Sequence, residues 1–514
     1  MPTLLLKIVA SIALITSQVH AFFLVDALKS FDHVHDQPET KCLVGSAVNT
    51  TSGMIIGHPA TEAPLVSEYL AIPFAQPPIS ELRFAPPSPY RGSGIVNSSS
   101  LPLNCPQSKV TFPGLIGNAS TQLNEYLVAV TAGPNGWAED CLYLNIWTKP
   151  QTGEAKKAVM VWFYGGAFKA GGSNSAVYNG QYFADLHDVI VVTFNYRVSA
   201  LGFSGAPGLE QNVGLLDQRL AVEWVRDNIA AFGGDVDRIT LFGESAGAAS
   251  IDYYNHVYMD DPIIAGSIME SGSTTLGNAT SNITAAALWK GLAANCSCGT
   301  GNESQVLACM RDVPIAQLVE YAAAFPFNPS VDNQLVFQNY TKLRDQGAFI
   351  KKPALIGNNV YEAAWFKLKT GLIKSESFWD AFNANVFTCV SNDLAQIRRL
   401  FHVPAWRYQF FPSFPDTELP YNASLATHTS EIPLVFGTFN DAFKSTPGTP
   451  EERSLSNFMM AYWSAFAKNP YRGLTEKGWP LYNQTQKSLA LLGFQHRYSR
   501  STLVRPDFID HVCA

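Results

Sequence analysis

The chain has 514 residues, of which 47% are hydrophobic and only 15% are charged. This low charge fraction favours one large, well-filled core. The formal net charge of −7 argues against nucleic acid and against an anionic membrane surface as partners, because both attract basic patches.

The first 21 residues have the pattern of a secretory signal peptide. Lys7 precedes an apolar run over residues 8–15, and Val19-His20-Ala21 supplies small residues for cleavage. This run is too short to cross a bilayer, and no later stretch reaches 18 apolar residues. We expect residues 1–21 to be removed, residues 22–514 to form a single domain, and the protein to be secreted into the extracellular space with no membrane span. An N-terminal anchor helix is the alternative.

Cysteines and glycosylation sequons agree with secretion. None of the eight cysteines belongs to a Cys-x-x-Cys pair, which makes zinc and thioredoxin-like sites poor interpretations. An even number of cysteines in a secreted chain predicts disulfides. Ten Asn-x-Ser/Thr sequons predict a glycosylated surface. They lie at Asn49, Asn97, Asn118, Asn278, Asn282, Asn295, Asn302, Asn339, Asn422 and Asn483.

From about residue 140 onward, short apolar runs alternate with a helical pattern. The expected strands cover residues 158–164, 189–194, 239–242, 265–269, 353–357 and 406–411. Between the second and third of these, residues 217–229 place apolar side chains at helical spacing. This alternation predicts the α/β class, with a mostly parallel central sheet and helices on both faces. Reactive groups of such sheets lie beyond the carboxyl ends of the strands.

Residues 243–247, Gly-Glu-Ser-Ala-Gly, form the only G-x-S-x-G pattern in the chain. An apolar strand runs directly into it and small residues expected to be helical, 248–250, follow. This strand–turn–helix context is where a nucleophilic serine is exposed on a sharp turn. Ser245 is therefore the candidate nucleophile, and an ordinary glycine-rich turn is the structural alternative.

A nucleophilic serine needs N–H donors for the oxyanion that its attack creates. One donor is expected from Ala246, which follows the serine. Gly165-Gly166-Ala167 follows the strand at 158–164, where the second donor loop is expected, so we predict Gly166 and Ala167 as the other donors. A simple Gly-Gly turn is the alternative.

The histidine and the acid are less sharply defined by spacing. Only His256, His402, His428, His496 and His511 follow Ser245. His256 is expected to lie too close to the elbow to reach across the site, and His428 sits in a polar loop after the strand at 406–411. For the acid, Glu362 follows the end of the strand at 353–357. Asp332 and Asp345 compete with it, and spacing does not separate the three.

Several segments resemble the type-B carboxylesterase/lipase family, which includes the cholinesterases. The longest are residues 139–147, Glu-Asp-Cys-Leu-Tyr-Leu-Asn-Ile-Trp, and residues 232–248 around Ser245; shorter ones cover 195–198, 212–218 and 269–273. The similarity extends from about residue 43 to the end. It implies an α/β-hydrolase fold and a serine carboxylesterase or lipase that cleaves a small-molecule or lipid ester through an acyl-enzyme, with no metal and no organic cofactor.

The resemblance also implies which residues act. The family's acid follows a Pro-x-Leu-Ile-Gly-x-Asn pattern, which places it on Glu362 here, and the family's histidine precedes Glu-Ile and Val-Phe-Gly, which places it on His428. His428 would take the Ser245 proton and return it to the leaving alcohol, while Glu362 would orient the ring and stabilise its cation.

Disulfides are implied by the same resemblance. Cys105 is expected to pair with Cys141, Cys389 with Cys513, and Cys309 with Cys296 or Cys298; Cys42 and the spare cysteine have no assigned partner. The loop closed by Cys105 and Cys141 has two interpretations, a mobile lid as in the lipases or a fixed wall of the substrate gorge.

The chain also departs from the family pattern. Tyr361 and Ala363 stand where Asp and Gly are usual beside the acid, and Thr429 stands where Gly is common. Thr131 occupies the position of the choline-binding tryptophan, which disfavours choline esters. The expected function is hydrolysis of esters with apolar acyl or alcohol parts. A dedicated lipase and a noncatalytic adhesion or binding protein are the alternatives.

Overall fold

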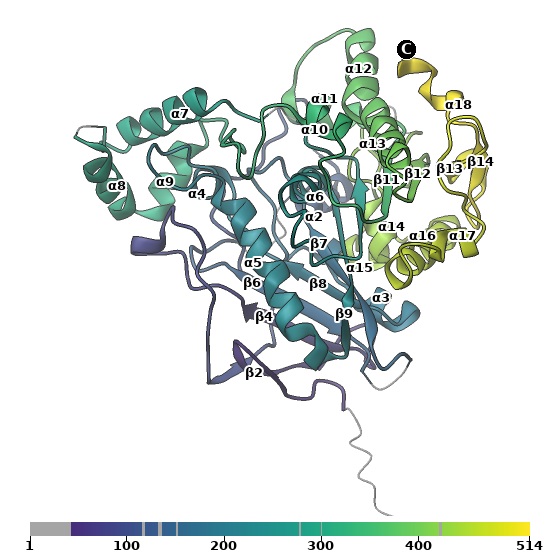
Figure 1. Ribbon diagram of the computed structural model, residues 1–514, viewed down its shortest axis with the longest axis horizontal. Helices are drawn as coiled ribbons and strands as arrows, with labels where there is room; N and C mark the ends of the chain where they lie inside the picture. Colours follow the sequence, from purple (N-terminus) through teal and green to yellow (C-terminus); the bar gives the residue numbers. More distant parts are fainter. Residues whose placement is uncertain are drawn as a thin grey trace, which may run out of the picture. The chain divides into compact units, whose positions relative to one another are not determined.

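The computed structural model describes residues 43–115, 119–131, 136–150, 153–276, 279–299, 301–420 and 424–513 (Figure 1). These residues belong to one unit that begins at Leu43. The expected signal peptide, Cys42 and the sequons at Asn118, Asn278 and Asn422 lie outside the described residues.

Within the described residues, the central element is an eleven-stranded sheet with the order β14-β13-β12-β11-β10-β9-β7-β8-β6-β4-β3. Neighbouring strands from β8 through β7 to β13 are parallel, whereas the pairs at both edges of the sheet are antiparallel. Its strands are β3 (His58–Pro59), β4 (Ser67–Pro73), β6 (Tyr143–Thr148), β7 (Lys157–Phe163), β8 (Ile190–Phe194), β9 (Gly234–Glu244), β10 (Gly266–Glu270), β11 (Ala354–Asn359), β12 (Ala405–Phe410), β13 (Leu489–Leu492) and β14 (Thr502–Val504).

A small second sheet has the order β1-β2-β5, with β1 (Val48–Thr50), β2 (Gly53–Ile56) and β5 (Ile95–Asn97). The helices are α2 (Thr121–Thr131), α3 (Gln181–His187), α4 (Ser199–Gly202), α5 (Val213–Asn228), α6 (Ala246–Val257), α7 (Asn282–Asn295), α8 (Glu303–Asp312), α9 (Ile315–Ala322), α10 (Tyr340–Asp345), α11 (Ala363–Thr370), α12 (Glu376–Asn383), α13 (Cys389–Leu400), α14 (Ile432–Phe436), α15 (Phe439–Ala442), α16 (Pro450–Lys468), α17 (Gly473–Glu476) and α18 (Asp507–Asp510).

The central strands are buried along their whole length. Every residue of β7, β8, β10, β11 and β12 is buried, and β7 and β8 are nearly continuous apolar runs. Such runs are typical of parallel strands that are covered on both faces. Phe242 of β9, for example, contacts Phe183 of α3 and Phe436 of α14, while α6 also packs against β9.

The expected α/β class is thus confirmed, and each expected strand is present with its ends shifted by a few residues. The two expected helices are longer than predicted. The helix expected from residue 217 already begins at Val213, and α6 begins at Ala246, immediately after the candidate nucleophile. Glycines 214 and 247 stand near these two starts, and glycine lowers the helical signal of a sequence pattern.

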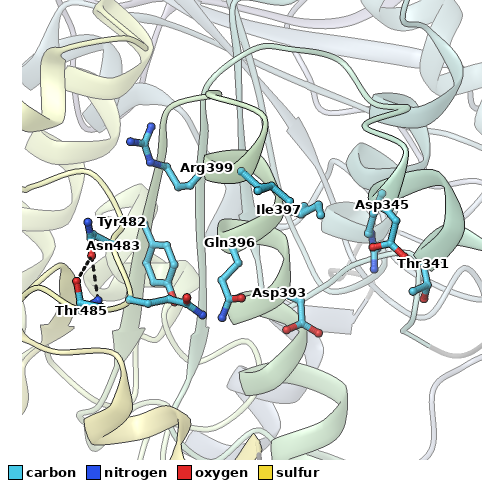
Figure 2. A pocket seen from close by; sticks show the side chains of 12 residues that line it. Thr341, Asp345, Asp393, Gln396, Ile397, Arg399, Tyr482, Asn483 and Thr485 are labelled. Atoms are coloured by element: carbon cyan, nitrogen blue, oxygen red, sulfur yellow. Dashed lines mark hydrogen bonds between the residues drawn. The ribbon is translucent and has the colours of Figure 1, made fainter.

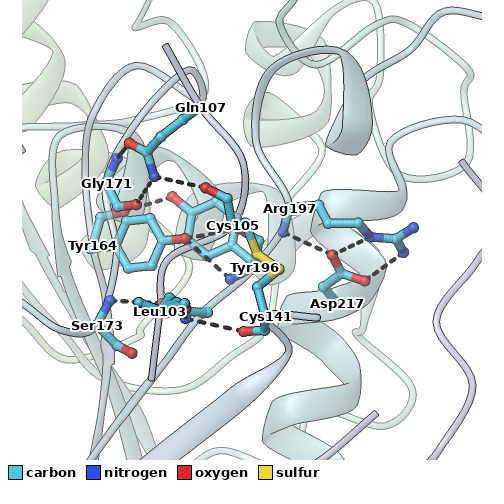
Figure 3. Close-up of a disulfide and its surroundings, with 11 residues drawn as sticks. Leu103, Cys105, Gln107, Cys141, Tyr164, Gly171, Ser173, Tyr196, Arg197 and Asp217 are labelled. Atoms are coloured by element: carbon cyan, nitrogen blue, oxygen red, sulfur yellow. Dashed lines mark hydrogen bonds and ion pairs between the residues drawn. A yellow bond between two sulfur atoms is a disulfide. The ribbon is translucent and has the colours of Figure 1, made fainter. Parts of the chain in front are cut away.

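Three disulfides join distant segments of the described chain: Cys105–Cys141, Cys298–Cys309 and Cys389–Cys513. They coincide with the pairs that the resemblance implies, and Cys296 is a free, buried thiol. Figure 3 shows the first disulfide beside Gln107, whose side-chain amide bonds both backbone polar groups of Gly171 at 2.7 and 2.8 Å. Among the described residues, no helix is long and apolar enough to cross a membrane.

Candidate active site

Ser245 lies on a sharp turn between β9 and α6. Its backbone has φ 55° and ψ −122°, a left-handed conformation that costs a non-glycine residue free energy. The Ser245 N–H donates to the Glu270 carbonyl at 2.9 Å, which fixes the turn to the end of β10. A Cβ atom on Gly247 would lie 1.9 Å from the Phe163 carbonyl oxygen. The strand and the helix therefore approach each other so closely that only glycine fits at position 247.

Two further loops contact the serine turn closely, each at a glycine residue. A Cβ atom on Gly272 would lie 2.1 Å from the Ser245 carbonyl oxygen, and one on Gly165 would lie 2.9 Å from the Ser245 Cβ. The loop after β10 and the loop after β7 thus contact the same turn from different sides. This close packing holds the strained conformation of Ser245 in place.

His428 lies between Ser245 and Glu362 and contacts both. His428 Nε2 is 2.8 Å from Ser245 Oγ, and His428 Nδ1 is 2.6 Å from Glu362 Oε2. The three residues are 6%, 2% and 0% exposed, in the order Ser245, His428, Glu362. Only the serine therefore keeps measurable access to a substrate, while the other two side chains are enclosed.

The carboxyl group of Glu362 is held from its far side. Its Oε1 accepts hydrogen bonds from Ser271 Oγ at 2.7 Å and from the Asn359 N–H at 2.6 Å. The Asn359 side chain in turn donates to the Thr427 carbonyl at 2.7 Å and to Glu431 Oε2 at 2.5 Å. The end of β11 is therefore bonded to the loop that carries His428, although the two are about 70 residues apart in sequence.

The residue after His428 explains one departure from the family pattern. Thr429 has φ 74°, the region that favours glycine, and glycine is common at this position in the family. The Thr429 hydroxyl lies 2.7 Å from the Tyr126 hydroxyl, which also donates to the His428 carbonyl at 3.3 Å. This hydrogen bonding from α2 compensates for the less favourable backbone. The rings of Phe366 and Phe387 flank the imidazole at 5.0 and 5.4 Å.

Burial dominates the electrostatics of these groups. Burial raises the pKa of Glu362 to about 8, although the hydrogen bonds from Ser271 and Asn359 lower it in part. Burial lowers the pKa of His428 to about 3, which keeps its imidazole neutral. When Glu362 is ionised, the Nδ1–H of the neutral ring donates to it, and the Nε2 lone pair is free to accept the Ser245 hydroxyl proton.

Two more buried carboxyl groups stand close to the histidine. Glu244 Oε1 lies 3.2 Å from His428 Nε2, and Glu431 bonds to Asn359. Burial raises the pKa of Glu431 to about 7, and burial together with the nearby Glu431 and Glu362 raises the pKa of Glu244 well above its usual range. Sequence reasoning assigned no role to these two acids, to Ser271, to Asn359 or to Tyr126. All of them except Tyr126 lie within three residues of a predicted site residue or within a family motif.

The expected oxyanion donors lie around the serine turn. Among the described residues, the N–H groups of Gly166, Ala167 and Ala246 have no hydrogen-bond acceptor. Gly166 and Ala167 have φ 114° and 57°, and the Gly166 carbonyl accepts the N–H groups of Lys169 and Ala170. The Gly166 carbonyl is thus bonded within its own turn, and the N–H groups of Gly166 and Ala167 remain available to bind an anion.

The competing candidates have structural partners elsewhere. Asp332 Oδ1 accepts the N–H groups of residues 334–336 at 2.8–2.9 Å, which closes a turn. Asp345 lines a cavity formed by segments that precede β11, β12 and β13. His256 lies on α6, with Nδ1 bonded to the Ala348 carbonyl at 2.6 Å. Of the residues that spacing left open, the structure places Glu362 and His428 beside Ser245.

Known proteins resemble most of the chain. The sequence profile of the Carboxylesterase family matches residues 45–378 and 373–505. Chlorogenic acid esterase from Aspergillus niger is 36% identical over 447 residues, which cover 84% of each chain. Secreted lipase 5 from Gibberella zeae is 35% identical over 482 residues, which cover 84% of this chain and 87% of the relative.

A solved structure is similar as well. A PNB esterase superposes with a TM-score of 0.77 and 27% sequence identity, over 91% of this chain and 99% of that chain. The sequence motifs, the parallel sheet and these matches agree with one another. The chain belongs to the carboxylesterase family and is a carboxylic ester hydrolase with an α/β-hydrolase fold.

Proposed function

We propose that this protein is a secreted serine carboxylesterase that hydrolyses esters through an acyl-enzyme on Ser245. The observation that carries the proposal is the continuous hydrogen-bonded relay from Ser245 Oγ through the His428 ring to Glu362. A neutral imidazole held between a hydroxyl and a carboxyl group is the arrangement that converts an alcohol oxygen into a nucleophile.

In the first half of the reaction, Ser245 Oγ attacks the ester carbonyl carbon while His428 Nε2 takes the hydroxyl proton. The carbonyl oxygen becomes an oxyanion and accepts hydrogen bonds from the N–H groups of Gly166, Ala167 and Ala246. When the intermediate collapses, the bond to the alcohol breaks and His428 gives its proton to the departing oxygen. The acyl group is then bound to Ser245, and the alcohol leaves.

In the second half, a water molecule replaces the alcohol. His428 takes a proton from the water, whose oxygen attacks the acyl carbon, and then returns that proton to Ser245 Oγ as the carboxylic acid departs. Glu362 accepts the Nδ1–H throughout, which holds the ring in the tautomer that leaves Nε2 free. Its ionised form also stabilises the imidazolium that exists between the two transfers.

We propose esters with apolar acyl or alcohol parts as substrates. The imidazole is flanked by Phe366 and Phe387, and Phe168 of the oxyanion loop contacts Phe203 at 5.3 Å. Phe387, Phe168 and Phe203 are buried, whereas Phe366 is half-buried and offers apolar surface to a substrate group. Because one relative is named chlorogenic acid esterase, chlorogenic acid belongs in a substrate series together with aryl esters of increasing acyl length.

The contacts of the 105–141 loop favour an esterase over a lipase with a moving lid. Gln107 bonds Gly171, the Gly114 N–H donates to the Leu368 carbonyl at 2.9 Å, and Gln122 donates to the Asp416 carbonyl at 3.0 Å. Tyr126 bonds the loop of His428. A lid movement would break these contacts together, so we propose that the loop is a fixed wall. A rate that rises steeply once a triglyceride exceeds its solubility would instead indicate a lid.

We further propose that residues 1–21 are a signal peptide, that residues 22–514 form the mature domain, and that it is secreted and glycosylated. A relative at 35% identity is named a secreted lipase, and the three disulfides suit an oxidising compartment. The seven sequon asparagines within the described residues are all exposed, as glycosylation requires. Mass spectrometry of protein from culture medium tests the cleavage and the glycans together.

The central experiment compares Ser245→Ala with Ser250→Ala, a buried serine on the same helix. We expect Ser245→Ala to lose several orders of magnitude in kcat/KM for an aryl ester, and Ser250→Ala to remain within a few-fold of the native enzyme. A fluorophosphonate probe should label the native protein and Ser250→Ala only. If the native protein resists the probe and Ser245→Ala retains activity, a noncatalytic binding protein is the better interpretation.

A further inference from the structure

A cavity lies at the edge of the sheet opposite Ser245. Its volume is about 650 Å³, and its walls come from α10, from α13 and from the turn at residues 482–485 (Figure 2). These three segments precede β11, β12 and β13, which are parallel. Ser245, Glu362 and His428, in contrast, follow the strands β9, β11 and β12. The cavity is therefore separate from the proposed ester site.

The lining of this cavity is mainly polar. Among the described residues, the side chains of Asp345, Asp393 and Arg399 have no hydrogen-bond or ion-pair partner. Arg344 is only 8% exposed, and its Nε also lacks a partner there, although its Nη2 donates to Asp252 at 2.7 Å. Asp345 and Asp393 are exposed, Arg399 is half-buried and Arg344 is buried, so the unpaired desolvated groups are the two guanidinium groups, and the carboxylates stand beside them at the rim. Such a lining favours a ligand that offers both donors and acceptors.

Apolar groups share this lining with the polar ones. Ile397, Leu400 and the ring of Tyr482 complete the walls. Carboxylates, guanidinium groups and amides beside small apolar surfaces suit a pyranose, because a sugar ring presents hydroxyl groups at its rim and C–H groups on its faces. The volume also lies within the range of roughly 300–1,000 Å³ that holds ligands of drug or disaccharide size.

A glycosylation sequon forms part of the same wall. All three residues of Asn483-Gln484-Thr485 line the cavity. The Asn483 side-chain oxygen accepts hydrogen bonds from the Thr485 N–H and hydroxyl, both at 2.9 Å (Figure 2). Among the described residues, the Asn483 Nδ2 atom, which would carry a glycan, has no partner. The sequon is thus exposed, with its attachment atom free, at the rim of a polar cavity.

We propose that this cavity binds the N-acetylglucosamine units of a glycan attached to Asn483. The attachment holds the sugar beside its site, so its effective concentration is on the order of millimolar and weak contacts suffice. The hydroxyl and acetamido groups would bond Asp393, Gln396 and Arg399. The bound glycan would then join α13 to the turn before β13 and stabilise the folded protein.

The test measures whether the cavity and the glycan act together. Mass spectrometry first determines occupancy of Asn483 in the secreted protein. The midpoint of thermal unfolding is then compared for the native protein and Gln396→Ala, each with its glycans and after enzymatic removal of them under native conditions. We expect Gln396→Ala to lower the midpoint by several degrees more in the glycosylated protein than after deglycosylation, where the variant loses only the side-chain hydrogen bond between Gln396 and Tyr482.

Two controls separate this proposal from general effects of glycans and identify the source of the sugar. Asn97→Gln removes an exposed sequon on β5 and should leave the effect of Gln396→Ala unchanged, whereas Asn483→Gln should abolish it. Free N,N′-diacetylchitobiose at millimolar concentration should raise the midpoint of the deglycosylated protein and not that of the glycosylated one. An unmodified Asn483, equal effects of Gln396→Ala in both forms, or no response to the disaccharide would each overturn the proposal.

Discussion

The Tyr126 hydroxyl lies 2.7 Å from the Thr429 hydroxyl and donates to the carbonyl of the neighbouring His428. This contact connects α2, inside the disulfide-closed 105–141 loop, to the loop that carries the proposed general base. The pair is separated by 303 positions in sequence. The orientation of the imidazole therefore depends on the disulfide-closed loop.

Removing the Tyr126 hydroxyl tests this dependence. Tyr126→Phe leaves the buried Thr429 hydroxyl without this partner, so we expect a loss of about 1–2 kcal/mol in the free energy of unfolding. The imidazole should also be less well positioned, with kcat lower by about tenfold, a barrier increase of roughly 1.4 kcal/mol. KM for a small aryl ester should be little changed. Tyr498→Phe, which removes an exposed tyrosine hydroxyl bonded to His496, is the matched control and should retain native kinetics.

A second prediction concerns the acid itself. In Glu362→Gln, the amide oxygen would take the place of Oε1, because that position accepts two hydrogen bonds from Ser271 and Asn359. The amide NH2 would then face His428 Nδ1 and force the proton onto Nε2, the wrong tautomer. We expect kcat to fall by about 10³- to 10⁴-fold.

The matched control for this change is Glu376→Gln on α12, an exposed glutamate that pairs with Lys367. It should stay within a few-fold of the native kcat. A Glu362→Gln enzyme with more than a tenth of native kcat would mean that the carboxylate does not select the tautomer.

The pH profile should reflect the burial of His428. A protonated imidazole cannot accept the Ser245 proton, so kcat/KM falls below its pKa. Burial lowers that pKa from 6.5 to about 3, and a lowered pKa keeps the ring neutral at lower pH. The acid limb that protonation of His428 produces should therefore lie below pH 6.5, whereas protonation of Glu362, whose pKa burial raises to about 8, should produce a separate inflection near pH 8.

The positive charge of Lys369 contributes to the same shift, because it lowers the pKa of His428. Lys369→Gln should move the acid limb toward higher pH, while Lys374→Gln, a charge-matched change on the same segment, should not. A single acid limb at or above pH 6.5 that is retained in Glu362→Gln and moves with Lys369→Gln would contradict the burial of a neutral histidine.

The longest disulfide loop should matter for stability and not for chemistry. Cys389–Cys513 closes a loop with a sequence separation of 124 residues and attaches the C-terminal segment to α13. Replacing both cysteines with serine should lower the free energy of unfolding by about 2–5 kcal/mol, since the crosslink restricts the unfolded chain. Denaturant titration measures this, and kcat at 25 °C should remain near native. Loss of activity without loss of stability would place the C-terminus in the site.

Local sequence patterns predicted much of the candidate site. Ser245, Gly166 and Ala167 follow apolar strands directly, so strand-plus-turn reasoning was enough to predict them as site residues. Spacing left Glu362 among competitors, and the family resemblance selected it. The structure shows why Asp332 does not compete, since its carboxylate closes a turn with three backbone N–H groups.

Contacts between distant segments were beyond the reach of sequence patterns. The bond from Tyr126 to Thr429 and the bonds from Asn359 to Thr427 and Glu431 join loops whose relative positions depend on the whole sheet. The polar cavity is a similar case. Its three walls are far apart in the sequence, and they lie side by side only because β11, β12 and β13 are neighbours in the sheet. No local periodicity encodes such a meeting.

The left-handed backbone at Ser245 implies a trade-off between activity and thermostability at one position. A non-glycine residue in this conformation costs about 1–3 kcal/mol, and the surrounding packing leaves no room for relaxation. Glycine at position 245 should consequently give an inert protein that melts at a higher temperature than the enzyme. Selection for heat resistance alone would thus favour replacement of the nucleophilic serine by glycine.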